Sequence, residues 1–199
     1  RDTEIAMDEI PLDKLFEAAV RTCTVSAKDK DITLNIGGCN GTIQGDFDLM
    51  CDVLINLIDN AVKASPEGAE VKLNTEDGAI VVEDFGCGIP ESEIAKITEP
   101  FYMVDKSRSR KSGGAGLGLA LTKLILSHHG MEMSVESEVG KGTKIAVYSA
   151  DENVDAVGAC IGPSGQRESN IVEILCGEKI DIVRFSEEPE KYIAASLAP

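Results

Sequence analysis

Residues 48–64 read DLMCDVLINLIDNAVKA and predict the helix around which the fold is organised. Apolar residues recur three and four positions apart, which is the spacing of a helix that buries one face. Four polar residues lie within about 80° of one another on the other side: Asp52, Asn56, Asn60 and Lys63. Asparagine is a mediocre helix former, whereas carboxamide and carboxylate oxygens beside an ammonium suit Mg²⁺ and phosphate. The stripe fits either a metal and phosphate site or a solvated helix face.

Composition places the chain among soluble globular proteins and limits its partners. It has 199 residues, of which 43% are hydrophobic and 27% charged, and no apolar run is long enough to span a bilayer. The 35 acidic residues against 19 Lys and Arg give a net charge of −16. Charge-driven binding to nucleic acid or anionic lipid is therefore disfavoured, and a polyanion must be held at a specific site. The six cysteines form no C-x-x-C pair, which indicates reduced thiols in a cytosolic protein.

Hydrophobic periodicity predicts helices and strands on both sides of the central helix. Helices are predicted from Leu12 to Val20 and from Leu117 to His129. Residues 31–36 and 42–44 flank a glycine-rich turn, which predicts a β-hairpin. Further strands are predicted at residues 69–74, 79–84, 132–137 and 143–149. Residues 99–114 lack periodicity, carry basic side chains among serines and predict a mobile loop.

Two glycine-containing segments add candidate ligand contacts. Residues 81–90, VVEDFGCGIP, end a predicted strand at Asp84. A carboxylate there can accept a hydrogen bond from an exocyclic amine, while the glycines let the backbone pass under a flat ring. A plain turn with an aspartate cap fits the same letters. Residues 113–119, GGAGLGL, lead into a predicted helix, and the free N–H groups at a helix start can bind phosphates. This glycine segment follows a loop and not a strand, and it lacks the Gly-Lys-Ser/Thr ending of a P-loop. Neither a Rossmann nor a P-loop fold is predicted.

Taken in order, these segments resemble the GHKL ATP-binding fold, most closely the catalytic domain of sensor histidine kinases. The resemblance covers about residues 4–148. The matching elements are Asn56–Lys63 (N box), Asp84–Gly88 (G1 box), Glu99–Tyr102 (F box), Gly114–Leu119 (G2 box) and Gly140–Thr143. The fold class that this implies is α+β, a two-layer α/β sandwich of the Bergerat type, with a mixed sheet and helices on one face.

The resemblance implies a site for Mg²⁺ and ATP. Asp84 would bind the adenine amine, supported through water by Thr143, and Asn60, with Asn56 near it, would hold Mg²⁺. Asp52 stands where the family carries an acidic base or polariser of phosphoryl transfer, although many members have Glu there. The implied catalytic residues are Asp52, Asn56 and Lys63. The implied ATP-binding residues are Asn56, Asn60, Lys63, Asp84, Gly86, Gly88, Ile89, Phe101, Lys106, Arg108, Gly114, Gly116, Leu117, Gly118 and Thr143.

The resemblance also implies a lid and protein partners. Residues 101–113 would form a lid in which Lys106 and Arg108, together with Lys63, contact phosphates. A histidine kinase needs an acceptor histidine on a dimerisation domain and a response regulator. The histidines of this chain, His128 and His129, are adjacent at the end of a predicted helix and are interpreted as a cap. The chain would then bind ATP without completing autophosphorylation alone.

Residues 143–199 resemble a second family, the first KH module of the transcription elongation factor NusA. Residues 143–149, 155–165 and 177–183 carry this resemblance. KH modules clamp single-stranded nucleic acid with a G-x-x-G loop, which implies RNA contacts here. The implied RNA-binding residues are Gly162, Pro163, Ser164, Gly165 and Arg167. The family usually has Lys or Arg in the loop where this chain has serine, so a folded appendage without RNA activity is equally consistent.

These observations predict two domains. Residues 1–149 form the ATP-binding domain, and residues 150–199 form a small KH-like α+β module that shares or abuts strand 143–149. The predicted function is donation of the γ-phosphoryl group of Mg·ATP to a histidine outside this chain. A NusA-like RNA-binding or transcription-associated fusion with a nucleotide-sensing domain, and a plain GHKL ATPase, are the alternatives. The predicted location is the cytoplasm, either free or as the cytosolic part of a membrane-anchored sensor.

Overall fold

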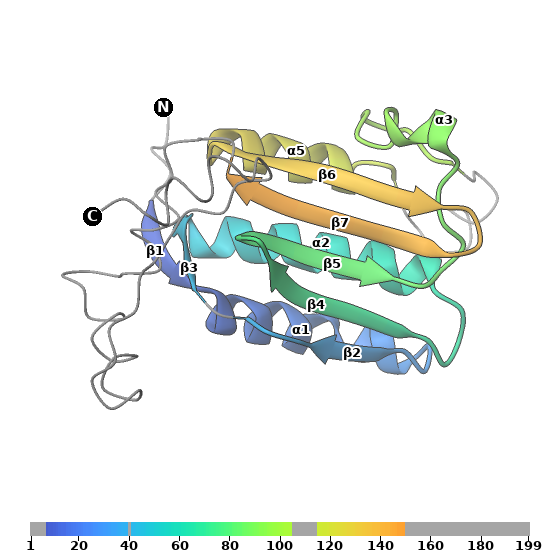
Figure 1. Cartoon of the computed structure of the whole chain (residues 1–199), viewed down its shortest axis with the longest axis horizontal. Coiled ribbons are helices and arrows are strands. Elements are labelled where there is room, and N and C mark those ends of the chain that lie inside the picture. Colours follow the sequence, from blue (N-terminus) through green and yellow to red (C-terminus); the bar gives the residue numbers. More distant parts are fainter. Residues whose placement is uncertain (1–6, 40, 105–114, 150–199) are drawn as a thin grey trace, which may run out of the picture. The chain divides into compact units, whose positions relative to one another are not determined.

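A five-stranded mixed sheet covered on one face by helices forms the described part of the chain (Figure 1). The computed structural model describes residues 7–39, 41–104 and 115–149. The strands are β1 (Asp8–Pro11), β2 (Thr33–Ile36), β3 (Thr42–Gly45), β4 (Glu70–Glu76), β5 (Ala79–Asp84), β6 (Met131–Glu138) and β7 (Gly142–Ser149). The helices are α1 (Leu12–Lys28), α2 (Phe47–Ala64), α3 (Glu91–Ile94) and α5 (Gly118–His128). Within these ranges no helix has the length and apolar character to cross a bilayer.

The sheet has the strand order β2-β4-β5-β7-β6 and mixes both kinds of pairing. β2 runs parallel to β4, whereas the other neighbouring strands are antiparallel. Helices α1, α2 and α5 lie along one face (Figure 1). The predicted two-layer α/β sandwich is therefore confirmed for this part of the chain. The predicted KH-like module, residues 150–199, lies outside the described residues.

The predicted hairpin between residues 31–36 and 42–44 is wrong. β2 pairs with β4, and β3 pairs with β1 in a separate two-stranded sheet. The backbone after β2 does not turn back, because Gly37 N donates to Leu73 O at 2.7 Å and Gly38 O accepts from Thr75 N at 2.8 Å. The glycines that indicated a turn instead extend the pairing with β4.

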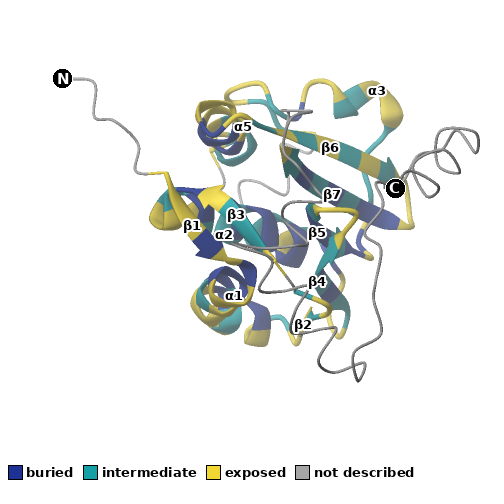
Figure 2. Cartoon of the chain, turned by 60° about the vertical axis from the view of Figure 1, so that its left-hand side comes forward, coloured by how far each residue is buried: buried dark blue, intermediate teal, exposed yellow. Residues whose placement is uncertain are grey.

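Alternating residues of the three middle strands form the inner face of the sheet. Ile80 and Val82 on β5 pair with Val147 and Ile145 on β7, and all four are buried. The buried face of α2 packs over them as part of the same core. Figure 2 shows the buried colour where the helices face the sheet and the exposed colour on their outer sides. The apolar side chains that recur at every second position of these strands thus pack against the apolar face of α2 in one core.

Helix α2 is capped by its own N-cap residue at the start and by a lysine from a remote part of the chain at the end. At its start, the Asp46 carboxylate accepts a hydrogen bond from Leu49 N at 3.0 Å. At its end, Lys30 Nζ donates to the carbonyl oxygens of Val62, Lys63 and Ser65 at 2.9, 2.9 and 2.6 Å. These are carbonyls that a helix leaves without an intrahelical donor, and a cation there also complements the helix dipole. Lys30 therefore fixes the end of α2 that borders the candidate site.

Substitution of Lys30 by Met tests this cap. We expect the free energy of unfolding to fall by about 1–3 kcal/mol, because three carbonyl groups lose a charged donor while the aliphatic stem is kept. Equilibrium urea unfolding measures the change. Lys28→Met, at an exposed position at the end of α1, is the matched control. Equal effects of the two substitutions would contradict the capping role.

Candidate functional site

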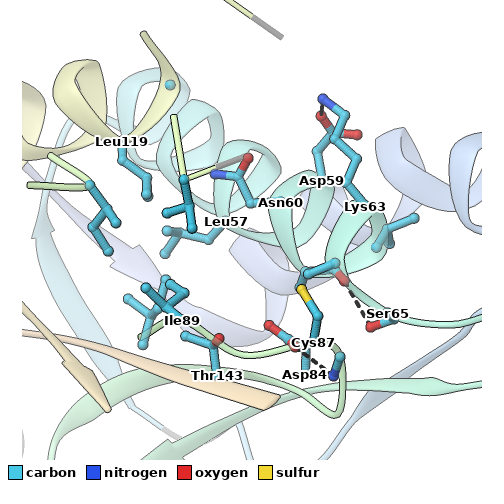
Figure 3. A pocket seen from close by; sticks show the side chains of 18 of the residues that line it. Leu57, Asp59, Asn60, Lys63, Ser65, Asp84, Cys87, Ile89, Leu119 and Thr143 are labelled. Atoms are coloured by element: carbon cyan, nitrogen blue, oxygen red, sulfur yellow. Dashed lines mark hydrogen bonds and ion pairs between the residues drawn. The ribbon is translucent and has the colours of Figure 1, made fainter. Parts of the chain in front are cut away.

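A cavity of about 1070 Å³ lies between α2, the segment after β5, the start of α5 and the start of β7. Its lining includes many of the residues implied by the sequence, and Figure 3 shows several of them. The predicted residues that line it are Asn56, Asn60, Lys63, Asp84, Gly86, Gly88, Ile89, Gly116, Gly118 and Thr143. The fold thus brings together four segments that lie far apart in the sequence.

The polar floor of the cavity is formed by Asp84 and Thr143, which lie side by side (Figure 3). Only 6% of Asp84 and 7% of Thr143 are exposed. Gly86 N donates to Asp84 Oδ1 at 2.8 Å. Burial raises the pKa of Asp84, and hydrogen bonds from the backbone N–H groups of Gly86 and Thr143 oppose that rise. The floor therefore presents a buried carboxylate, a group suited to a ligand that donates hydrogen bonds.

The wall opposite the floor is the polar face of α2. Asn56 Nδ2 donates to the buried Thr122 Oγ1 on α5 at 2.8 Å. A side chain at Gly118 would collide with the Asn56 amide, so glycine at this position lets Asn56 keep its place against α5. Asn60 extends from α2 into the cavity (Figure 3). These contacts fix the Asn56 amide against α5, and both Asn56 and Asn60 line the cavity.

Two charged residues of α2 occupy different settings. Lys63 Nζ forms an ion pair with Asp59 one turn earlier, at 2.5 Å, and both residues line the cavity. The Lys63 side chain is 42% exposed, so this pair contributes little to stability. Asp52 is exposed and does not belong to the lining. It lies on the same helical stripe, one turn before Asn56.

The F-box and G2-box segments meet at the other end of the cavity. Phe101 N donates to Gly116 O at 2.8 Å, which joins the two segments that flank residues 105–114. The side chains of Phe101 and Leu117 are 71% and 43% exposed and lie outside the lining. The predicted phosphate-binding residues Lys106, Arg108 and Gly114 lie outside the described residues. So do the predicted RNA-binding residues Gly162, Pro163, Ser164, Gly165 and Arg167.

Several residues of the site were not predicted from the sequence. Lys30 lines the cavity without any prediction, whereas Tyr102 and Met103 belong to the predicted lid but were not named as ligand contacts. Cys87 also lines it and lies inside the quoted strand-end motif and the G1-box match, without having been named as a contact. Nothing in the local sequence marks Lys30, because its three partners lie 32 to 35 residues further along the chain.

The histidine pair ends α5. His129 is the C-cap residue and is 7% exposed. Its Nδ1 lies 2.7 Å from Ile125 O, and because a carbonyl only accepts, Nδ1 carries the proton. Nε2 then accepts from Asp46 N at 3.1 Å. Both ring nitrogens of His129 are therefore engaged, Nδ1 within α5 and Nε2 in joining the end of α5 to the start of α2.

The arrangement of sheet, helices and cavity matches a known protein family. The model of the histidine kinase-, DNA gyrase B- and HSP90-like ATPases matches residues 45–153, more than half of the chain. The chain belongs to this ATPase family. The resemblance to the GHKL ATP-binding fold and to the catalytic domain of sensor histidine kinases is thereby confirmed.

Individual relatives of this ATPase domain are sensor kinases. The sensor histidine kinase YkoH of Bacillus subtilis is 36% identical over 152 residues, which are 75% of this chain and 33% of that protein. WalK of the same organism is 44% identical over 109 residues, which are 52% of this chain and 18% of that protein. The chain thus spans a third or less of these curated relatives.

Solved structures show the same architecture. The mycobacterial sensor histidine kinase MprB superposes with a TM-score of 0.59 at 25% identity, covering 71% of this chain and 95% of that one. Full-length ShkA in complex with AMPPNP superposes with a TM-score of 0.62 at 25% identity, covering 74% of this chain and 31% of that one. The ATPase fold therefore accounts for nearly three quarters of the chain.

A second family model overlaps the first. The NusA-like first KH domain matches residues 129–185. Its first residues coincide with β6 and β7, which belong to the ATPase sheet. The second predicted resemblance is thus found again, over a range that begins before residue 143.

Substitution of Asp84 by Asn tests the burial of the carboxylate. A raised pKa means that the folded chain binds this proton more tightly than the unfolded chain. Below the unfolded-state pKa, Asp84 is protonated in both states and its ionisation does not change the free energy of unfolding. As the pH rises through the folded-state pKa, ionisation of the buried carboxyl lowers the free energy of unfolding. We expect Asp84→Asn to be at least as stable as the wild type at pH 7, with the difference shrinking as the pH falls through the raised pKa.

Urea unfolding at pH 7 and at stepwise lower pH measures this difference. Glu83→Gln, on the other face of β5, controls for the loss of one negative charge. An Asp84→Asn variant that is less stable than the wild type at pH 7 would contradict the expectation.

Proposed function

We propose that this chain binds Mg·ATP and donates its γ-phosphoryl group to a histidine that is not present in this chain. The observation that carries the proposal is the buried Asp84 carboxylate at the floor of a cavity that the polar face of α2 borders. Adenine stacks in this cavity with its amine on Asp84, and the phosphates extend towards α5. The likeness to ShkA, which was solved as a complex with AMPPNP, supports the proposal.

The residues of α2 suit the metal and the phosphates. Among the described residues no cluster of three or more His, Cys, Asp or Glu side chains could hold a metal ion. Amide oxygens are hard ligands that fit Mg²⁺ when phosphate oxygens and water complete its shell. Asn60 and Asn56 would hold the ion, which would neutralise charge on the phosphates. Lys63 would leave its ion pair with Asp59 and bind a phosphate group instead. Lys106 and Arg108 would also bind phosphate.

The acceptor histidine belongs to a partner or to another segment. His129 is excluded, because both of its ring nitrogens are engaged and the ring is buried. Asp52 is exposed one turn from Asn56, where it would polarise an incoming imidazole. A dimerisation domain and a response regulator are the partners this chemistry requires, and the cytosol, where ATP is available, is the proposed location.

Thermal unfolding with and without Mg·ADP tests nucleotide binding. At about 100 times the Kd, ligand linkage contributes about 2.7 kcal/mol, which raises the Tm by about 5–10 °C for a chain of this size. We expect this shift in the wild type and its loss in Asp84→Asn. The absence of a shift in cooperatively folded wild-type protein would overturn the proposed function.

Phosphoryl transfer is tested by adding an acceptor in trans. We expect γ-labelled ATP to label a histidine-containing dimerisation domain from a sensor kinase relative, with no covalent label on this chain alone. Phosphate released at the same rate without the acceptor would instead indicate a plain ATPase. Asp52→Asn, compared with the exposed control Asp48→Asn at the start of α2, is expected to slow transfer without changing the ADP-induced shift.

An RNA-binding function is the second candidate, because a NusA-like KH model matches residues 129–185. The charge of residues 150–199, with 10 acidic against 4 basic side chains, opposes binding to a polyanion. Retention on single-stranded RNA that is lost in Gly165→Asp would support this candidate.

A further inference from the structure

Three polar side chains form a row across β6, β7 and β5. Ser137 pairs directly with Thr143, and Thr143 pairs directly with Asp84. Residues that pair directly across antiparallel strands point to the same face of the sheet. Ser137 therefore lies on the cavity side of the sheet, behind Thr143 as seen from Asp84, although it is not itself part of the cavity lining.

The Ser137 hydroxyl has three partners. Its oxygen accepts from Ile89 N at 2.8 Å, lies 2.9 Å from Gly142 O and lies 2.9 Å from Thr143 Oγ1. A hydroxyl has one proton and two acceptor lone pairs. Because the Gly142 carbonyl only accepts, the single Ser137 proton goes to it. The Thr143 hydroxyl must then be the donor in its hydrogen bond to Ser137.

The direction of this bond determines what Thr143 offers to a ligand. With its proton committed to Ser137, Thr143 Oγ1 presents only lone pairs to the cavity. The neighbouring Asp84 carboxylate is also an acceptor when it is ionised. Both groups are buried, so a ligand that brings an acceptor to them leaves polar atoms without partners, which is costly. A ligand that brings N–H donors meets no such penalty.

We propose that Ser137 is a positioning residue that sets base specificity, by turning the Thr143 hydroxyl so that the cavity floor favours a 6-amino purine over a 6-oxo purine. The inference rests on the proposed function, because it takes the ligand to be a purine nucleotide whose base lies on Asp84. Ser137 acts through Thr143 and does not touch the nucleotide.

The test compares the Kd values of ADP and IDP. ADP has an amino group at position 6 and an unprotonated N1, whereas IDP has an oxo group at position 6 and a proton on N1. Titration calorimetry well below the Tm measures both. We expect Ser137→Ala to reduce the IDP-to-ADP ratio of Kd values by about fivefold to tenfold, because the freed Thr143 hydroxyl can donate to the 6-oxo group. A purely structural loss would weaken both ligands alike and leave the ratio unchanged.

Matched variants separate specificity from folding. Ser134→Ala, at an exposed position on the same strand, is expected to keep the wild-type ratio, and Ser137→Thr, which retains a hydroxyl, is expected to restore it. Thr143→Val removes the acceptor and is also expected to lower the ratio. In that background Ser137→Ala should add less than about a twofold change, since coupled residues are not additive.

The outcomes distinguish the two proposals. An unchanged ratio in Ser137→Ala, or a further tenfold change in the double variant, would overturn the role of Ser137. If Ser137→Ala does not fold, an unchanged ratio in Thr143→Val would overturn it instead. Wild-type protein that binds neither ADP nor IDP would overturn the proposed function, and this inference with it.

Discussion

The register between β5 and β7 is the constraint on which the site depends. The inward positions of β5 are Ile80, Val82 and Asp84, and their partners on β7 are Val147, Ile145 and Thr143. On each strand the first two of these residues are apolar and lie in the core, and the third is polar and lines the cavity. A slip of one residue would turn Asp84 out of the cavity and bury Glu83 in the core, so the core that stabilises the sheet also holds the carboxylate in place.

Close backbone approach explains a motif glycine that the sequence linked only to the family pattern. A side chain at Gly142 would collide with the carbonyl oxygen of Asp84, and its φ of 114° is one that L side chains rarely adopt. β7 can therefore begin beside Asp84 only with glycine at this position. Together with Gly118 against Asn56, this shows that the glycines bring the strand end and α5 close enough to frame a single cavity.

Features that depend on local periodicity could be predicted from the sequence, whereas features that depend on register could not. The apolar spacing of residues 48–64 predicts α2, and the strand-end aspartate predicts the cavity floor. The hairpin prediction failed because Gly37 and Gly38 are compatible both with a turn and with an extended strand. Only the pairing with β4 decides between the two conformations. Lys30 and Ser137 escaped prediction because each is defined by hydrogen bonds to backbone groups remote in the chain.

The overlap of the two family matches can be judged from the edges of β7. This strand pairs with β5 through residues 143–147 and with β6 through residues 142–149, so both of its edges are occupied in the ATPase sheet. A strand in the middle of a sheet has no free edge to offer to a second sheet. Residues 142–149 are therefore committed to the ATPase sheet, although they fall within the range of the KH match. Strand 143–149 is therefore not available to a second sheet, as the KH resemblance would require.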